Sequence, residues 1–172
     1  MSKHYKVAVI GPIPRDHITT YRGDVIEKYG CITHPTVGLA QLLEGKGTVY
    51  PISHIRKQDM EAVKELFAPY PAIDMAGVSD KADSGDVIKL KFLDQNFRVE
   101  KQTAFMNAIM PADLAPFLDC DAFVFVPITD HEIALDTVKY LKEHSKGVII
   151  FDAHGPTHTM TIGGDRHKKF WV

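Results

Sequence analysis

The chain has 172 residues, the size of one compact domain, and its 20 lysines and arginines nearly balance its 22 aspartates and glutamates. This near-neutral charge argues against binding to nucleic acid or to an anionic membrane, because both need a basic excess. No apolar run approaches the roughly 18 residues of a membrane span, the first residues lack the layout of a signal peptide, and the two cysteines (Cys31 and Cys120) favour a reducing cytoplasm.

Apolar, β-branched segments predict three buried strands in the first half of the chain. They cover Tyr5–Ile10, which a Gly-Pro pair ends, and residues 48–52 and 72–78. Helices are predicted over residues 35–43, with a proline in the first turn, and over residues 58–67, where apolar residues recur at helical spacing.

The second half continues this alternation. Short helical patterns cover residues 113–118 and 132–144, and continuous apolar runs at residues 122–126 and Val148–Phe151 predict two further strands. Strands separated by helices at these intervals pack as right-handed βαβ units. The predicted fold class is therefore α/β, with a largely parallel sheet flanked by helices.

Two segments do not follow that alternation. Residues 17–29 are polar and rich in threonine and tyrosine, which indicates one or two short, partly exposed strands. Val87–Phe92 and residues 97–100 alternate apolar and polar side chains around Asp94-Gln95-Asn96, which is typical of a β-hairpin with one wet face. Together these segments predict a small second sheet beside the main one.

Asp16 is the first candidate ligand-binding residue, because it follows the first predicted strand, where open parallel sheets bind ligands. Its carboxylate has two adjacent oxygens that can accept hydrogen bonds from neighbouring hydroxyls of a sugar. An ordinary turn aspartate is the alternative interpretation. Nucleotide fingerprints are missing: Gly45-Lys46-Gly47 lacks the rest of a P-loop, and no G-x-G-x-x-G follows the first strand.

Asp152, His154 and His158 are a second candidate group, because they follow the last predicted strand. An Asp-x-His pair with a further histidine nearby can supply metal ligands. However, nine histidines in one chain make such groupings common by chance, and no H-E-x-x-H motif is present. A loop of hydrogen-bonding residues beside a substrate is the other interpretation.

In chain order, these features resemble the amino-terminal part of the PfkB/ribokinase family of carbohydrate and nucleoside kinases. Val7-Ala8-Val9-Ile10-Gly11 followed by Asp16 resembles the family's first strand, glycine and sugar-binding aspartate. Gly30 and the helix after it are similar to the family's glycine-rich substrate segment. Ile55-Arg56-Lys57-Gln58-Asp59 occupies the place of the segment with an aspartate before the second helix, and Val148-Ile149-Ile150-Phe151-Asp152 resembles the strand that ends beside the substrate pocket.

The resemblance implies one ribokinase-like domain, of which residues 1–172 are the amino-terminal portion. Its protruding hairpins, at about 17–29 and 87–107, would form a β-lid that closes over the substrate and contributes to a homodimer. An open hairpin edge also invites pairing across a two-fold axis. The expected partner is a small sugar or nucleoside.

The resemblance also implies substrate-binding roles for single residues. Asp16 would bind sugar hydroxyls, Gly30 would allow close approach of the backbone, and Asp152 and His154 would lie near the pocket. Phe105 of the lid would cover the substrate. No catalytic residue and no metal ligand is assigned.

The chain departs from the family pattern in several places, among them Val126-Pro127-Ile128-Thr129, where many relatives have an acidic or amide residue at the strand end. Cys31 stands where the family has the second glycine of a pair, and Pro35 stands at or near its substrate-binding asparagine, so the substrate stays open. The family's second signature, a Gly-Ala-Gly-Asp-like turn that opens a helix and carries the base, has no match, because Gly163-Gly164-Asp165 is too short and lacks a following helix. ATP and Mg²⁺ are implied by the family, but their site is not visible in this chain.

Three hypotheses follow. The first is ATP-dependent phosphorylation of a hydroxyl of a sugar or nucleoside-like compound, with this chain as part of a longer kinase or as a diverged derivative. The second is a non-catalytic sugar- or nucleoside-binding module. The third is a metal-dependent hydrolase that uses Asp152, His154 and His158.

Overall fold

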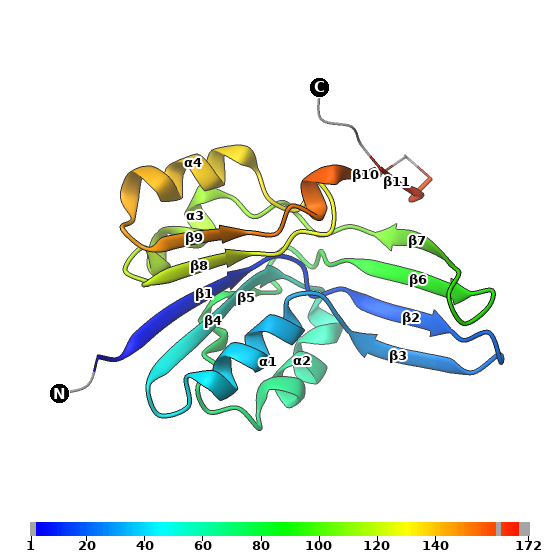
Figure 1. Ribbon diagram of the computed structural model, residues 1–172, viewed down its shortest axis with the longest axis horizontal. Helices are drawn as coiled ribbons and strands as arrows, with labels where there is room; N and C mark the ends of the chain where they lie inside the picture. The colour runs from blue at the N-terminus through cyan, green and yellow to red at the C-terminus, as the bar shows by residue number, and fades with distance from the viewer. Residues whose placement is uncertain (1–2, 161–162, 169–172) are drawn as a thin grey trace.

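The computed structural model describes residues 3–160 and 163–168, and the fold is built on two sheets that meet near the middle of the molecule (Figure 1). The main sheet is parallel, with the strand order β5-β4-β1-β8-β9. Its strands are β1 (Tyr5–Ile10), β4 (Gly47–His54), β5 (Val78–Ser79), β8 (Ala122–Phe125) and β9 (Val148–Phe151). The predicted α/β class with a largely parallel sheet is confirmed.

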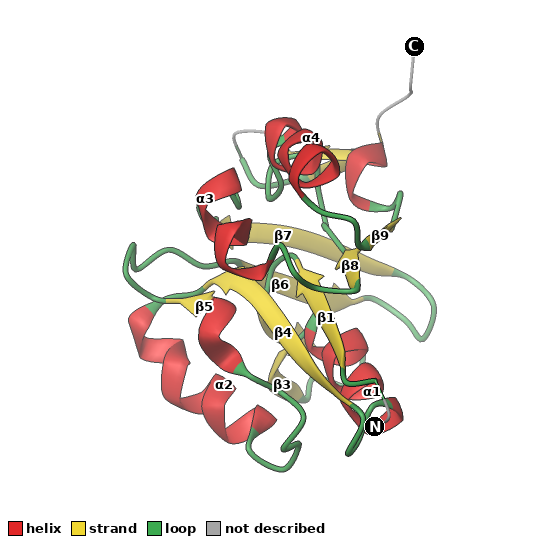
Figure 2. Cartoon of the chain, turned by 90° about the vertical axis from the view of Figure 1, so that its left-hand side faces the viewer, coloured by secondary structure: helices red, strands yellow, loops and turns green. Residues whose placement is uncertain are grey.

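Helices lie on both faces of the main sheet (Figure 2). One face carries α1 (Thr33–Leu42) and α2 (Met60–Phe67), and the other carries α3 (Pro111–Leu114) and α4 (Leu135–His144). Val9 and Ile10 point to opposite faces of β1, yet both are 0% exposed. Burial on both faces explains why the sequence of β1 is a continuous apolar run. Within the described ranges, none of the helices has the length and apolarity to span a membrane.

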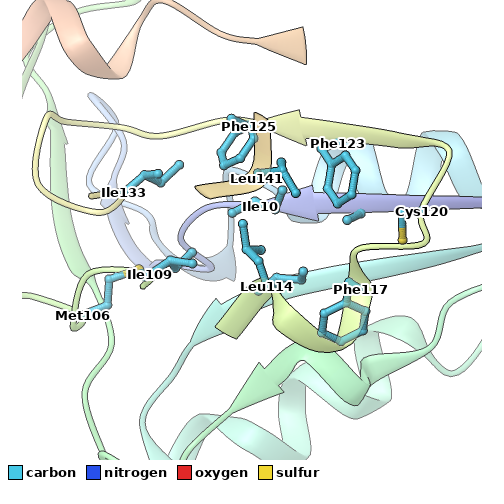
Figure 3. Close-up of a cluster of buried hydrophobic side chains, with 12 residues drawn as sticks. Ile10, Met106, Ile109, Leu114, Phe117, Cys120, Phe123, Phe125, Ile133 and Leu141 are labelled. Carbon is cyan, nitrogen blue, oxygen red and sulfur yellow. The ribbon is translucent and has the colours of Figure 1, made fainter. Parts of the chain in front are cut away.

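The core beneath α3 and α4 is built from alternate residues of neighbouring strands (Figure 3). Ile10 of β1 and Phe123 and Phe125 of β8 are fully buried, and they belong to one cluster with Leu114 of α3 and Leu141 of α4. Burial of each such side chain stabilises the fold by roughly 1.5–3 kcal/mol. This core fixes the carboxyl ends of β1 and β8, beside which the candidate site lies.

The second sheet has the strand order β3-β2-β6-β7. Its strands are β2 (Arg15–Thr19), β3 (Val25–Tyr29), β6 (Val87–Phe92) and β7 (Arg98–Ala104). At its centre β2 and β6 pair in parallel, and each forms an antiparallel hairpin with its outer neighbour. Ile18 and Ile88 are buried, whereas Lys89 and Lys91 are exposed. The predicted small second sheet with one wet face is confirmed.

A short hairpin of β10 (His158–Met160) and β11 (Arg166–Lys168) lies beside β7. The backbone N–H of Gln102 in β7 donates to the carbonyl oxygen of Gly164 at 2.9 Å. A strand therefore follows Gly163-Gly164-Asp165, and this turn does not open a helix in the described part of the chain.

Residues 72–78 do not form the predicted strand. Ile73 forms a single bridge to Val49 of β4, a 3-10 turn follows at Met75–Gly77, and the strand that pairs with β4 is confined to Val78–Ser79. The Asp74 carboxylate accepts a hydrogen bond from the backbone N–H of Ala76 at 2.9 Å. An aspartate that bonds the chain two residues later stabilises a turn instead of a strand.

The start of α4 differs from the prediction, whereas β9 has the predicted bounds. α4 begins at Leu135 instead of residue 132, because the Glu132 carboxylate turns back to accept hydrogen bonds from the preceding loop. β9 is an edge strand, and its Val148 and Ile150 side chains are 62% and 53% exposed. Its apolar sequence alone does not distinguish an edge strand from a central one.

Candidate functional site

A cleft of about 810 Å³ lies between the second sheet and the loops that follow β1, β8 and β9. Its apolar lining consists of Pro14, Cys31, Ile88, Leu90, Val99, Val126, Pro127 and Ile128. Its polar lining consists of Asp16, Arg98, Glu100, Asp152, His154, His158, Asp165, His167 and Lys168. The carboxyl edge of an open parallel sheet is where such folds bind their ligands.

Asp16 lines this cleft, and Gly30 lies directly against Asp16 without lining the cleft itself. Asp16 is the second residue of β2, between Lys28 of β3 and Ile88 of β6, and it is 8% exposed. A β-carbon added to Gly30 would stand 2.5 Å from Oδ2 of Asp16. A side chain at Gly30 would therefore have to displace the Asp16 carboxylate.

Cys31 lines the same cleft. Its backbone has φ +51°, in the left-handed region that residues other than glycine rarely adopt. Burial raises the pKa of its thiol above the ordinary range, and the nearby charges of Glu132 and Asp86 raise it further. The Cys31 thiol is therefore protonated and a poor nucleophile.

Asp152 and His154 also line the cleft, on the side of the main sheet. Oδ1 of Asp152 accepts a hydrogen bond from the backbone N–H of His154 at 2.9 Å, which forms a turn at the end of β9. The rings of His154 and His158 stack with centroids 4.4 Å apart, and Nδ1 of His158 lies 2.8 Å from the carbonyl oxygen of His154. These residues form a hydrogen-bonded loop, and the expected place of that loop beside a substrate stays a prediction.

The metal-dependent hydrolase hypothesis finds no centre in the described residues. Within 3–160 and 163–168, no group of three or more histidine, cysteine, aspartate or glutamate side chains is arranged to hold a metal ion. Asp152, His154 and His158 line the cleft without forming such a group. A catalytic zinc centre ordinarily needs three protein ligands.

Phe105 lies just after β7 and is not one of the residues that line the cleft. Its side chain is 41% exposed, and its ring meets the ring of His131 edge-on at a centroid distance of 6.4 Å. The expected role of Phe105 as a cover over the substrate stays a prediction.

Asp86, at the base of the second sheet, is a buried acid that the sequence does not reveal. Its side chain accepts a hydrogen bond from the backbone N–H of Met106 at 2.6 Å. Its backbone carbonyl oxygen accepts one from the backbone N–H of Arg15 at 2.9 Å. Asp86 therefore links the beginnings of β2 and β6 to the segment after β7. Burial raises the pKa of its carboxyl to about 7, and the charge of Glu132 adds to this rise.

Glu132 is 0% exposed and holds the loop that lines the cleft after β8. Its carboxylate accepts hydrogen bonds from the backbone N–H groups of Ile128 at 3.1 Å and Thr129 at 2.7 Å, and from the Thr129 hydroxyl at 2.7 Å. Burial raises the pKa of this carboxyl. The Thr-x-x-Glu spacing, typical of a capping box, is the sequence signal that could have identified Glu132.

No family model and no curated protein matches the sequence. Solved structures match its fold. A pyrophosphate-dependent kinase in the ribokinase family, complexed with a pyrophosphate analog and myo-inositol, matches with a TM-score of 0.76 and 15% identity, over 95% of this chain and 54% of its own. The Halothermothrix orenii fructokinase matches with a TM-score of 0.69 and 14% identity, over 90% of this chain and 58% of its own.

A third match is the aminoimidazole riboside kinase from Salmonella enterica, complexed with aminoimidazole riboside and an ATP analog. It has a TM-score of 0.61 and 22% identity, over 86% of this chain and 49% of its own. The chain thus has a ribokinase-like fold, and the predicted resemblance in fold is confirmed. It spans about half the length of the solved structures that it matches.

Proposed function

We propose that the cleft binds a small polyhydroxylated molecule, such as a sugar, a cyclitol or a nucleoside, and that this chain is the substrate-binding part of a kinase. The observation that carries the proposal is the Asp16 carboxylate, which lies nearly buried at the cleft wall against Gly30. A carboxylate accepts hydrogen bonds from two neighbouring hydroxyls, and such charge-assisted bonds are stronger than neutral ones.

The rest of the lining suits such a molecule. Ile88 and Leu90 place apolar surface near Asp16, where it can contact the C–H face of a sugar ring or a base. Asp152 and His154 add polar groups from the main-sheet side. An apolar pocket with a few polar groups from different elements is typical of a small-molecule site.

For the complete protein, we propose transfer of the γ-phosphoryl group of ATP to a substrate hydroxyl, with Mg²⁺. The described residues do not fit these two groups. The Gly163-Gly164-Asp165 turn leads into β11 and not into a helix whose N–H groups could bind phosphates, and no acidic cluster within 3–160 and 163–168 could hold the metal. We assign no catalytic base and no reaction step to this chain.

We propose that the second sheet acts as a lid over the substrate and carries a homodimer contact. β3 is an edge strand with Val25 and Ile26 72% and 47% exposed, and apolar edge strands invite pairing with a second copy. Sedimentation should give a dimer for the wild type and a monomer for Ile26→Lys, and a monomeric wild type would contradict the contact. We place the protein in the cytoplasm, where its two free cysteines stay reduced.

Saturation-transfer NMR with myo-inositol, D-fructose and D-ribose tests the proposed binding site. We expect the wild type to bind at least one of them, and Asp16→Asn to weaken that binding by about tenfold or more, because hydrogen bonds to a charged group contribute about 1.5–3 kcal/mol. Asp94→Asn, on the exposed turn between β6 and β7, is the matched control and should bind as the wild type does. Binding of no probe, or unchanged binding by Asp16→Asn, would contradict the proposal.

The intact mass of the natural protein separates a kinase from the non-catalytic binding module. A mass near the 19.2 kDa of this chain favours the module, and a mass near twice that value favours the kinase. For a protein of the larger mass, ATP and pyrophosphate should both be tested as phosphoryl donors, since the structural neighbours include a pyrophosphate-dependent kinase and one complexed with an ATP analog.

A further inference from the structure

Asp59 stands at the N-cap position of α2 but does not cap that helix. An aspartate at this position ordinarily accepts hydrogen bonds from the first backbone N–H groups of the helix. The Asp59 side chain makes no such bond, although it is only 5% exposed. A buried carboxylate destabilises the fold unless it is paired, so its partners indicate its role.

Three side chains from three segments donate hydrogen bonds to this carboxylate. The Tyr29 hydroxyl lies 3.0 Å and Nη1 of Arg15 lies 3.4 Å from Oδ1, and Nε of Arg56 lies 2.8 Å from Oδ2. Burial, together with the bond to Asp59, raises the pKa of Tyr29 to about 12, so its hydroxyl stays a donor. Because Arg15 and Tyr29 belong to the second sheet, Asp59 joins that sheet to the main body.

The positions of Arg15 and Tyr29 connect this cluster to the cleft. The two residues face each other in the β2–β3 ladder, and the next residue on each is Asp16 and Gly30, respectively. Side chains alternate along a strand, so Arg15 projects from the face of β2 opposite to Asp16. Arg15 and Tyr29 line a groove beside α2, whereas Asp16 lines the cleft.

We propose that Asp59 is a positioning residue for the cleft: it holds Arg15 and Tyr29 from behind and so keeps Asp16 and Gly30 in their relative position. This inference rests on the proposed function of the cleft. The contact between Asp16 and Gly30 leaves no room for even a β-carbon, so a small rotation of β2 against β3 moves the carboxylate. Asp59 bonds both strands, whereas the ion pair between Arg15 and Glu27 lies within the second sheet, so loss of Asp59 loosens the attachment of both strands to α2.

Three variants test this role by ligand affinity. The probe is whichever of myo-inositol, D-fructose and D-ribose the wild type binds most tightly. We expect Asp59→Asn to weaken binding of this probe by about tenfold or more. Tyr29→Phe loses one neutral hydrogen-bond donor, so we expect it to weaken binding by about two- to fivefold. Glu61→Gln is the control, because Glu61 lies in the first turn of α2, is exposed and forms a surface ion pair with Lys64. A merely structural role would lower the unfolding midpoint of Tyr29→Phe and leave the affinity of its folded form unchanged, and that result overturns the proposal.

A second readout needs no ligand. The backbone N–H of Gly30 donates to Pro14, and that of Arg15 donates to Asp86, so their hydrogen exchange reports the attachment of β2 and β3. In Asp59→Asn and Tyr29→Phe we expect faster exchange at these two amides than in the wild type, with the Val126 amide, bonded to Ile10, unchanged as the internal reference.

The two readouts separate the two proposals. A wild-type chain that binds none of the three probes contradicts the proposed function, and the exchange measurement then decides the role of Asp59 by itself. Unchanged exchange at Gly30 and Arg15 in both variants overturns that role whether or not a probe binds. If Asp59→Asn does not fold, Tyr29→Phe carries both measurements.

Discussion

The Cys31 thiol donates a hydrogen bond to the carbonyl oxygen of Val126 at 3.2 Å, and so joins the segment before α1 to the end of β8. The left-handed backbone of Cys31 costs an L-residue about 1–2 kcal/mol. Both partners line the cleft. The shape of the cleft at this point therefore depends on a backbone conformation that the surrounding structure imposes.

Cys31→Gly should be more stable than Cys31→Ala. Both variants lose the bond to Val126, but only glycine adopts a positive φ without strain. After the greater flexibility of glycine in the unfolded chain is allowed for, we expect a difference of about 0.5–1 kcal/mol. Urea unfolding of the two variants measures it, and a more stable alanine variant would show that the left-handed conformation costs nothing here.

Gly30→Ala should weaken polyol binding by about tenfold or more, because the new methyl group must displace the Asp16 carboxylate. Gly30 does not have a left-handed φ, so alanine fits its backbone and the effect is steric. Gly38→Ala in α1 is the control, since its β-carbon meets no atom within 4 Å. We expect that variant to bind normally and to be stabilised by about 0.5–1 kcal/mol. Equal affinities of the two variants would place Asp16 outside the binding site.

Asp86→Asn should gain stability relative to the wild type as the pH rises from about 4 to 7. The folded state raises the pKa of Asp86 from 3.8 to about 7, so it binds the proton more tightly than the unfolded chain does. The wild type therefore loses stability across this range, at up to about 1.4 kcal/mol per pH unit. Asparagine keeps an acceptor for Met106 and does not titrate. Urea unfolding at several pH values measures the difference, and a gap between the two proteins that does not change with pH would show that the pKa is not raised.

Glu132→Ala should cost about 2–4 kcal/mol of folding stability, because the N–H groups of Ile128 and Thr129 and the Thr129 hydroxyl lose their acceptor. Glu132→Gln keeps an acceptor oxygen and removes the buried charge, so we expect it to lie within about 1 kcal/mol of the wild type. Thermal or urea unfolding compares them. If the two variants are equally unstable, the charge itself and not the hydrogen bonding holds the loop.

The strands of the main sheet could be predicted because burial on both faces produces continuous apolar runs, as in Tyr5–Ile10. The same signal fails at residues 72–78. Ala72 and Ile73 pack against the core, yet Asp74 bonds its own chain and forms a turn. An apolar segment is expected to be buried, but buried turns and buried strands are both apolar, so composition alone does not distinguish them.

Residues of the candidate site could be predicted only where their position just after a predicted strand was enough to identify them. Asp16 and Asp152 both line the cleft, and both come shortly after a strand of the parallel sheet. Asp59 bonds partners 30 and 44 residues earlier, so its role depends on the register of β2 and β3 and on the start of α2 together. No local pattern contains that information. For Phe105, a lone aromatic residue at a strand end does not indicate toward which side its ring will turn.

The parallel pairing of β2 with β6 has a consequence for folding. Arg15 pairs with Val87, and α1, β4, α2 and β5 all lie between them in the chain. Two isolated hairpins are marginal in water, and their joining closes a long loop whose entropy cost must be met first. The second sheet should therefore form late, after the intervening segment has collapsed onto β1. In a refolding experiment, protection of the amides of β2 and β6 should appear in the last kinetic phase, and the cleft would exist only from that moment.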